Sequence, residues 1–286
     1  MIANPAAGGG RTGRALEGVR QTLTELGLDH HLELTRSLEH ARELATAAAA
    51  AGEVAVAFGG DGLIGAVADA ARRCDGVVGV LPGGRGNDFV RVLGIPLAPR
   101  EACRILGSGT IRNLDLGLAG DKTFIGIASC GFDSEANRIA NETRLVHGKL
   151  VYAYGALRAL VSWRPATFEV RLDGGQPRRM TGYTVAAANS KAYGGGMLLA
   201  PDASLEDGLL DVVMVEDVPK LRLLRLLPTV FKGEHVRQRN VHVLRAAEVQ
   251  ITASRPFTLY ADGDPVQQLP VTVRALRGAV RVIVPS

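Results

Sequence analysis

The fold of this chain follows above all from residues 58–65, which read Phe58-Gly59-Gly60-Asp61-Gly62-Leu63-Ile64-Gly65. An apolar run over 54–58 predicts a buried strand, and the Ala/Val-rich residues after the glycines predict a helix. Glycines at a strand-to-helix turn let the backbone approach an anion closely, and the amides at the start of the helix point towards it. A carboxylate does not bind phosphate directly, so we expect Asp61 to contact a metal ion or a hydroxyl. The segment therefore indicates phosphate chemistry.

A second turn of the same kind follows the apolar run at 77–81 and reads Pro82-Gly83-Gly84-Arg85-Gly86-Asn87-Asp88-Phe89. The whole first half alternates short apolar strands with helices of about 10–15 residues, which indicates βαβ units and a parallel sheet covered on both faces. We expect strands at 2–3, 31–34, 54–58, 77–81 and 110–116. We expect a helix that follows a loop at 7–11 and ends near residue 26, and further helices at 38–51, at 99–107 and from the first glycine turn to residue 72.

From about Leu118, short alternating runs separated by Gly, Pro and Asp turns replace this pattern and indicate an antiparallel β-sandwich. We expect its strands at 123–128, 166–172, 182–188, 210–215, 241–244, 248–252, 257–261 and 271–274. Two helices interrupt the strands, one over 133–163 with a break near Gly148 and one over 219–231. The shift of pattern alone predicts two domains, residues 1–117 and residues 118–275.

Composition excludes several classes of protein. The 286 residues are 47% hydrophobic and 22% charged, which is ordinary for a globular protein. No apolar run reaches the roughly 18 residues that a membrane span needs. Three scattered cysteines, Cys74, Cys103 and Cys130, support neither a disulfide framework nor a zinc site. The first residues lack the basic and apolar regions of a secretory signal, so we expect a cytoplasmic protein.

The positive charge of the chain is concentrated in one segment. The net charge is +4, and residues 220–240 carry six lysines and arginines against one glutamate. A single basic segment argues against a nucleic-acid-binding protein, which has a broader basic surface with interleaved aromatic residues. Residues 219–227 are also rich in leucine, and a basic amphipathic helix can lie on an anionic lipid surface. Packing of this helix on a sheet is the alternative.

Together, the Gly-Gly-Asp-Gly turn and the segment at 81–89 resemble the bacterial lipid kinases of the diacylglycerol kinase family, relatives of sphingosine kinases and, more distantly, of NAD kinases and phosphofructokinases. Further matches at 4–9, 188–211 and 260–265 extend the resemblance over nearly the whole chain. It implies a three-layer α/β nucleotide-binding domain of the NAD kinase and phosphofructokinase type, then an antiparallel β-sandwich domain with inserted helices. Residues 276–286 would return to the first domain.

The resemblance implies a nucleotide site at the carboxyl ends of the parallel strands. The matching residues are Asn4, Thr35, Gly59, Gly60, Asp61, Gly62, Leu63, Gly65, Gly84, Arg85, Gly86, Asn87 and Asp88. Leu63 and Gly65 replace a threonine and an asparagine of the family, and Arg85 replaces a second threonine. We hypothesise that Arg85 binds phosphate and compensates for the hydroxyl lost at Leu63; a solvated loop charge is the alternative. We expect Asn87 to tie the loop down, and for Thr35 a helix N-cap is the alternative.

The resemblance also implies a base and a metal ion. The family's Asp-Gly-Glu-Pro motif has a glutamate that accepts the proton of the substrate hydroxyl, and Asp264 takes that position here. Asp61 is a rival for this role, and a tight turn is the alternative interpretation. A structural Mg²⁺ would be held by the side chain of Asp207 and by carbonyl groups near Ser204 and Leu209. Without the resemblance, residues 206–208 read as a hairpin turn.

The leading hypothesis is an ATP- and Mg²⁺-dependent kinase that phosphorylates the hydroxyl of a diacylglycerol-like lipid. Such an enzyme would be cytoplasmic and peripherally associated with the membrane, and residues 219–239 are the candidate contact with lipid. An NAD kinase-like enzyme is the first alternative. A nucleotide-binding regulatory protein with weak catalysis is the second, motivated by Leu63, Gly65 and Asp264. The sequence leaves a homodimer open.

Overall fold

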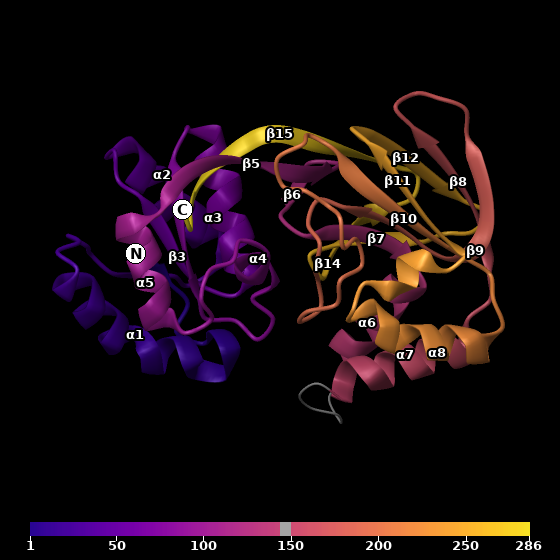
Figure 1. Ribbon diagram of the computed structural model, residues 1–286, viewed down its shortest axis with the longest axis horizontal. Helices are drawn as coiled ribbons and strands as arrows, with labels where there is room; N and C mark the ends of the chain where they lie inside the picture. The colour runs from indigo at the N-terminus through magenta and orange to yellow at the C-terminus, as the bar shows by residue number, and fades with distance from the viewer. Residues whose placement is uncertain (144–149) are drawn as a thin grey trace.

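The computed structural model describes residues 1–143 and 150–286 and has two lobes that two long strands connect (Figure 1). The N-terminal lobe contains a parallel sheet with the strand order β4–β3–β1–β2. Its strands are β1 (Ile2–Ala3), β2 (Glu33–Leu34), β3 (Ala55–Gly59) and β4 (Val77–Pro82). The strands β3 and β4 are buried almost throughout, as expected of apolar runs that are covered on both faces.

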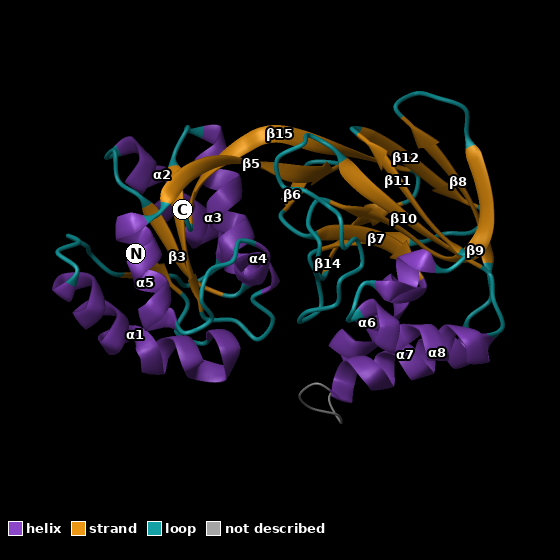
Figure 2. Cartoon of the chain, viewed as in Figure 1, coloured by secondary structure: helices purple, strands orange, loops and turns teal. Residues whose placement is uncertain are grey.

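Helices cover both faces of this sheet (Figure 2). They are α1 (Ala7–Glu25), α2 (Leu38–Ala50), α3 (Asp61–Arg73), α4 (Asp88–Val92) and α5 (Pro99–Ser108). Helix α1 packs against α5, and α2 packs against α3. The three-layer α/β arrangement is therefore confirmed. The N-cap of α2 is Ser37, whose Oγ accepts a hydrogen bond from His40 N at 3.0 Å, so the N-cap alternative for Thr35 is wrong.

The C-terminal lobe is built from antiparallel strands around a main apolar core, with two smaller apolar clusters beside it. The strands are β5 (Thr110–Ala119), β6 (Lys122–Phe124), β7 (Ile127–Gly131), β8 (Ala166–Leu172), β9 (Arg178–Ala188), β10 (Leu210–Glu216), β11 (Val241–Ala246), β12 (Glu248–Ala253), β13 (Thr258–Ala261), β14 (Asp264–Gln268) and β15 (Val271–Val284). The helices are α6 (Phe132–Glu142), α7 (Leu150–Ser162) and α8 (Lys220–Val230), with a 3₁₀ turn at Glu234–Arg237. The expected β-sandwich class is confirmed.

Three expectations about this lobe are corrected. The strand expected at 123–128 is two strands, because the amides of Ile125 and Gly126 turn away to bond a carboxylate of a later loop. The strand expected at 271–274 is the first part of a longer strand, β15, which continues into the returning residues as far as Val284. The strand β14 was not expected, since four of its five residues are exposed and give no apolar signal. The break expected near Gly148 lies outside the described residues.

The strand β15 belongs to both lobes. Residues Val271 to Arg274 pair antiparallel with β12, and Arg281 and Val282 pair parallel with β4. Along almost its whole length β15 also pairs with β5, with a register shift between Leu276 and Val280. The parallel sheet of the first lobe therefore continues into the sheet of the second lobe (Figure 1).

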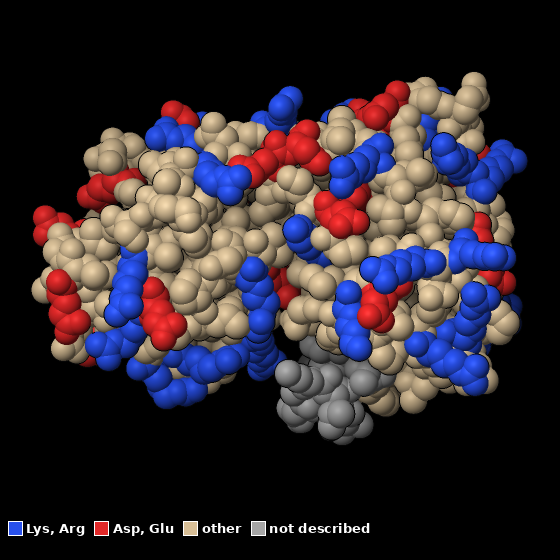
Figure 3. All heavy atoms as spheres, viewed as in Figure 1, with Lys and Arg blue, Asp and Glu red and all other residues tan. Residues whose placement is uncertain are grey.

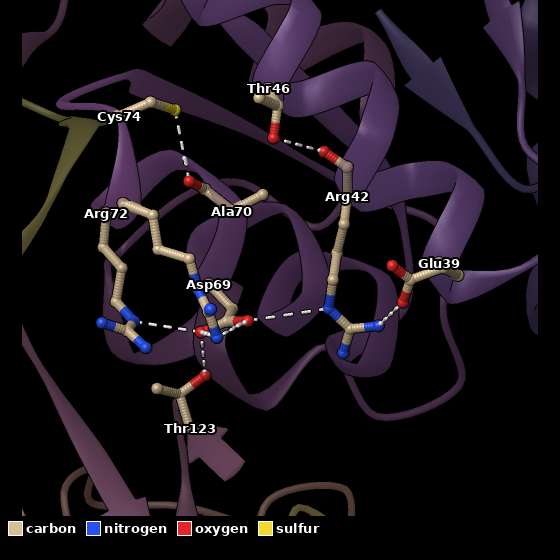
Figure 4. A network of polar contacts seen from close by, with 9 residues as sticks. Glu39, Arg42, Thr46, Asp69, Ala70, Arg72, Cys74 and Thr123 are labelled. Atoms are coloured by element: carbon tan, nitrogen blue, oxygen red, sulfur yellow. Dashed lines mark hydrogen bonds and ion pairs between the residues drawn. The ribbon is translucent and has the colours of Figure 1, made fainter. Parts of the chain in front are cut away.

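A buried carboxylate fastens the lobes together at α3 (Figure 4). Asp69 accepts hydrogen bonds from Thr123 Oγ1 on β6 at 2.8 Å and from Arg72 Nε at 3.0 Å. Arg73 Nη2 and Arg42 Nε lie 3.2 and 3.6 Å from its second oxygen. Burial by itself raises the pKa of a carboxyl, but the bond from Thr123 and the arginine charges outweigh it and hold the pKa of Asp69 below its ordinary value.

Candidate active site

The two glycine turns predicted from the sequence lie directly against each other. Gly83 N donates to Gly59 O at 2.7 Å, and Thr12 Oγ1 donates to Gly83 O at 3.2 Å. A Cβ atom at Gly84 would lie 2.5 Å from the Cα of Gly60, so no side chain fits where the two backbones cross. The turns therefore form a cradle without side chains at the carboxyl ends of β3 and β4, where ligands of open α/β sheets bind.

Asn87 holds the second turn in shape. It has a left-handed φ of 53°, its Oδ1 accepts from Gly84 N at 2.7 Å, and its Nδ2 donates to Gly84 O at 3.2 Å. Arg11 Nη2 donates to the same carbonyl at 3.0 Å. Arg85 is exposed beside them and forms no hydrogen bond or ion pair with any residue that the structure describes. Its guanidinium is therefore free to bind an anion over the cradle.

Two carboxylates stand at the mouth of the cradle. Asp61 is the first residue of α3, and its Oδ1 accepts from Phe89 N at 3.1 Å. A Cβ atom at Gly86 would lie 3.1 Å from Asp88 Oδ2 and 3.3 Å from Asp61 Oδ2, so the two carboxylates flank this glycine. Asp88 Oδ2 accepts from Gly195 N of the C-terminal lobe at 2.8 Å, whereas its buried Oδ1 has no partner among the described residues. Burial, together with the charge of Asp61, raises the pKa of Asp88.

A third carboxylate approaches from the other lobe. Asp262 follows β13 with a left-handed φ of 50°. Its carboxylate accepts from the backbone amides of Ile125, Gly126 and Ile127 at 2.8, 2.9 and 3.2 Å. The residue is open to solvent on one side, while protein surrounds the carboxylate on the others. This burial raises the pKa of Asp262 to about 6 although the three amides lower it, and the nearby charge of Asp61 raises it further.

The structure places Asp264, the predicted base, in a different setting. Its Oδ2 lies 3.1 Å from Lys122 Nζ, and its side chain is 59% exposed. Asp262 was missed in the sequence, although the Asp-Gly-Asp motif offered both carboxylates. The signal that could have identified it is the glycine in Ile125-Gly126-Ile127, which splits the expected strand and frees three consecutive amides.

The remaining predicted nucleotide residues lie around the same edge of the sheet. The side chains of Asn4 and Thr35 bond the backbone two residues further on, at 3.1 and 2.6 Å, and so shape the turns after β1 and β2. Leu63 packs into the core of the N-terminal lobe instead of facing the cradle. Gly62 and Gly65 lie near the start of α3 with open space where a side chain would be. The structure thus gathers the predicted residues at one edge, with Leu63 turned inwards.

The predicted Mg²⁺ loop is ordered by its own hydrogen bonds. Asp207 Oδ1 accepts from Leu209 N at 3.0 Å, and Ser204 Oγ accepts from Glu206 N at 3.2 Å. The buried Asp115 of β5 accepts a hydrogen bond from Gly208 N at 2.6 Å and so fixes the loop to that strand. No cluster of three or more His, Cys, Asp or Glu residues suited to a metal occurs in the described ranges. One carboxylate oxygen with nearby carbonyls nevertheless fits a hard cation that keeps several waters.

A side-chain-free anion cradle beside fixed carboxylates from two lobes is typical of phosphotransferases, in which positioning and electrostatics carry the reaction. Comparison with known proteins agrees. Residues 1–119 match the model of the diacylglycerol kinase catalytic domain, and residues 126–284 match that of the YegS C-terminal NAD kinase beta sandwich-like domain. The chain belongs to the diacylglycerol kinase family and is a lipid kinase by this membership.

Individual relatives cover the whole chain. It is 36% identical to a diacylglycerol kinase of Mycobacterium tuberculosis, over 99% of this chain and 94% of that one. The crystal structure of a diacylglycerol kinase from Bacillus anthracis has a TM-score of 0.76 at 20% identity, covering 99% of this chain and 95% of that chain. An NAD kinase from Archaeoglobus fulgidus in complex with ATP has a TM-score of 0.54 at 14% identity, covering 99% and 92%, which shows a likeness of fold.

Proposed function

We propose that this protein transfers the γ-phosphoryl group of ATP, with Mg²⁺, to the hydroxyl of a diacylglycerol-like lipid and releases a phosphatidate-like product. The observation that carries the proposal is the contact of the C-terminal lobe with the second glycine turn, where Gly195 N donates to Asp88 Oδ2 at 2.8 Å, with Asp262 of that lobe near enough for its charge to interact with that of Asp61. The names of the relatives support it, since one is a diacylglycerol kinase and an NAD kinase of similar fold was solved with ATP.

The N-terminal lobe would bind the nucleotide. Phosphate oxygens would lie against the backbone of the cradle and accept hydrogen bonds from the backbone amides at the start of α3. These amides form the positive end of the helix dipole. Arg85 would add charge-assisted hydrogen bonds from the rim. This arrangement needs no hydroxyl at Leu63, whose side chain belongs to the core.

Asp61 and Asp88 would hold the Mg²⁺ that accompanies the nucleotide. The buried Oδ1 of Asp88 lacks a partner among the described residues, and the two carboxylates flank Gly86. Such a pair suits Mg²⁺, which is commonly bound by one or two carboxylates plus phosphate oxygens and waters. When bound, the ion neutralises negative charge on the phosphates. Asp207 would hold a second, structural ion away from the reaction.

Asp262 would act as the general base that accepts the proton of the lipid hydroxyl. Three backbone amides fix its orientation, and a pKa of about 6 leaves it charged at neutral pH while keeping it a better base than an ordinary aspartate. Asp264, two residues further on, is paired with Lys122 and would contribute to the electrostatics of the rim. We therefore propose Asp262, and not Asp264, as the base.

Transfer of labelled phosphate tests the proposal directly. Purified protein is incubated with γ-labelled ATP, Mg²⁺ and detergent-dispersed diacylglycerol, monoacylglycerol, ceramide or sphingosine, with NAD as a separate acceptor. Label in phosphatidate is the expected result. Label in NADP would instead support the NAD kinase alternative. ATP binding without transfer to any acceptor would support the regulatory alternative and contradict the proposal.

A further inference from the structure

Helix α8 presents an apolar stripe that is left uncovered by the part of the chain that the structure describes. Leu221, Leu224, Pro228 and Phe231 are exposed, and Leu221 and Phe231 are 61% and 56% accessible. At about 100° per residue these four positions fall within an arc of about 80°. Leu223 and Leu226, which pack into the protein, lie on the opposite side of the helix. The exposed stripe is therefore not the edge of the face that packs on the lobe.

A second stripe lies on the neighbouring helix α7. Tyr154, Leu157 and Val161 are exposed at the spacing of one helix face, and Val161 is 75% accessible. The two helices meet where Lys220 Nζ at the start of α8 donates to Val161 O at the end of α7, at 2.9 Å. Figure 1 places both helices at one end of the C-terminal lobe. Six of the thirteen exposed large apolar side chains in the described ranges belong to these stripes, so they gather here.

Cations flank both stripes. On α8, Lys220 lies about 60° to one side of the stripe axis and Arg225 lies about 80° to the other, whereas Arg222 lies about 140° away, on the side of Leu226. Arg158 occupies the corresponding place on α7. Lysine and arginine side chains cover the region of α8 in the space-filling view (Figure 3). Apolar residues bordered by cations suit a bilayer surface. The apolar side chains can enter the boundary of the acyl chains while the cations contact the anionic headgroups.

The end of α7 also lines a cavity of the C-terminal lobe. The cavity has a volume of about 330 Å³, and Ser162, Trp163 and, from β13, Thr258 and Tyr260 are among its lining residues. Asp262 follows two residues after Tyr260 on the same chain segment. The same cavity therefore contacts both the end of α7 and the strand that leads to Asp262.

We propose that α7 and the segment from Lys220 to Lys232 form the membrane face, a docking surface for a bilayer with anionic headgroups. This deepens the proposed function, because it rests on an acceptor that resides in a membrane. The apolar stripes enter the boundary between headgroups and acyl chains, and the flanking cations contact the headgroups. The face binds the surface of the bilayer and does not cross it, since none of the helices described is long and apolar enough to span one.

Vesicle sedimentation without nucleotide tests the membrane face independently of catalysis. The full-length protein is mixed with vesicles of phosphatidylcholine alone or with phosphatidylglycerol at about 30 mol%. Binding is expected with the anionic vesicles, decreasing as salt rises. Leu221→Ser/Leu224→Ser should weaken it about tenfold or more, because both side chains lose their place in the bilayer. Arg225→Glu/Lys232→Glu, both exposed within the proposed face, should weaken it at least about fivefold per cation lost.

Matched variants on the N-terminal lobe control for changes of surface and charge. Ile111→Ser removes another exposed apolar side chain, and Arg20→Glu/Arg104→Glu reverses two other exposed cations. These variants should bind vesicles like the wild type. Equal binding by the α8 variants and the wild type, or no binding of the wild type to anionic vesicles, would overturn the proposal. So would a dimer in light scattering that Leu221→Ser/Leu224→Ser converts to a monomer, because the face would then serve a second copy.

Transfer to a short-chain diacylglycerol in detergent separates this proposal from the proposed function. The α8 variants should retain the wild-type rate with that acceptor and lose rate with diacylglycerol in anionic vesicles. If no variant and no wild-type protein transfers phosphate to any lipid, the proposed function fails while the vesicle binding still decides the membrane face.

Discussion

Replacing Asp262 by asparagine should abolish most of the phosphate transfer, because the variant cannot accept the proton of the lipid hydroxyl. General-base catalysis contributes about 10²–10⁴ in rate, which corresponds to about 3–5 kcal/mol of activation free energy. The variant also offers one oxygen where the carboxylate offers two to the amides of Ile125, Gly126 and Ile127. The lost acceptor should cost about 1–3 kcal/mol of folding free energy, which denaturant titration measures separately.

The matched control is Asp264→Asn. It removes a carboxylate charge two residues after Asp262, and that charge belongs to an exposed ion pair with Lys122. Initial rates are measured at saturating ATP with detergent-dispersed diacylglycerol. We expect Asp264→Asn to remain within about tenfold of the wild type, since exposed ion pairs are worth about 0–1 kcal/mol. A wild-type rate for Asp262→Asn together with a loss of about 100-fold or more for Asp264→Asn would refute the assignment of the base and restore Asp264 to that role.

The pH dependence gives a second check on the same assignment. The base must be charged, and the pKa of Asp262 is raised to about 6. The rate should therefore fall as pH drops through about 6, to about a tenth of its plateau at pH 5, and should be level above pH 7. The residual rate of Asp262→Asn should lack this step. A wild-type profile that is flat down to pH 5 would contradict the assigned base.

Three further changes probe the cradle and the junction of the lobes. Gly84→Ala should abolish ATP binding in calorimetry, because its Cβ would meet Gly60, whereas Gly65→Ala, with open space around it, should keep it. Arg85→Ala should raise the KM for ATP about tenfold, the value of one charge-assisted hydrogen bond; an unchanged KM would make Arg85 a solvated loop charge. Asp69→Asn should lower the free energy of unfolding at pH 7 by about 1–3 kcal/mol. Because the folded pKa of Asp69 is lowered, its contribution is complete above the unfolded pKa of about 4 and is lost as pH falls through the folded pKa, so urea titrations of wild type and Asp69→Asn should converge at low pH.

The parallel half of the fold could be predicted because its signals are local. The runs at 54–58 and 77–81 are apolar throughout, and the glycines that follow them mark both the turns and the anion cradle. The strand β14 could not be predicted, because a polar edge strand has no buried face to give it a period of two. Similarly, β15 reads as two strands because the register shift interrupts its alternation.

The sequence could predict which segments form the candidate site, but not how their side chains are arranged in it. Motif spacing identified the glycine turns and Asp61, yet it could not tell which carboxylate of the Asp-Gly-Asp turn is held by backbone amides. That choice depends on the left-handed backbone of Asp262 and on three amides more than 130 residues earlier in the chain. Asp69 gave no signal either, because its partner Thr123 is 54 residues away. Contacts of this range are set by tertiary structure, which single-residue patterns do not encode.

The strand that both lobes share has a consequence for how the protein folds. Because β15 pairs with β4 in one lobe and β12 in the other, neither lobe's part of the sheet is complete until β15 has been made. A fragment ending at residue 119 would leave the edge of β4 uncovered, and such an edge recruits other chains. We therefore expect the fragment to aggregate, and the intact chain to unfold in a single cooperative transition. Despite its two-lobed outline, the molecule is one folding unit.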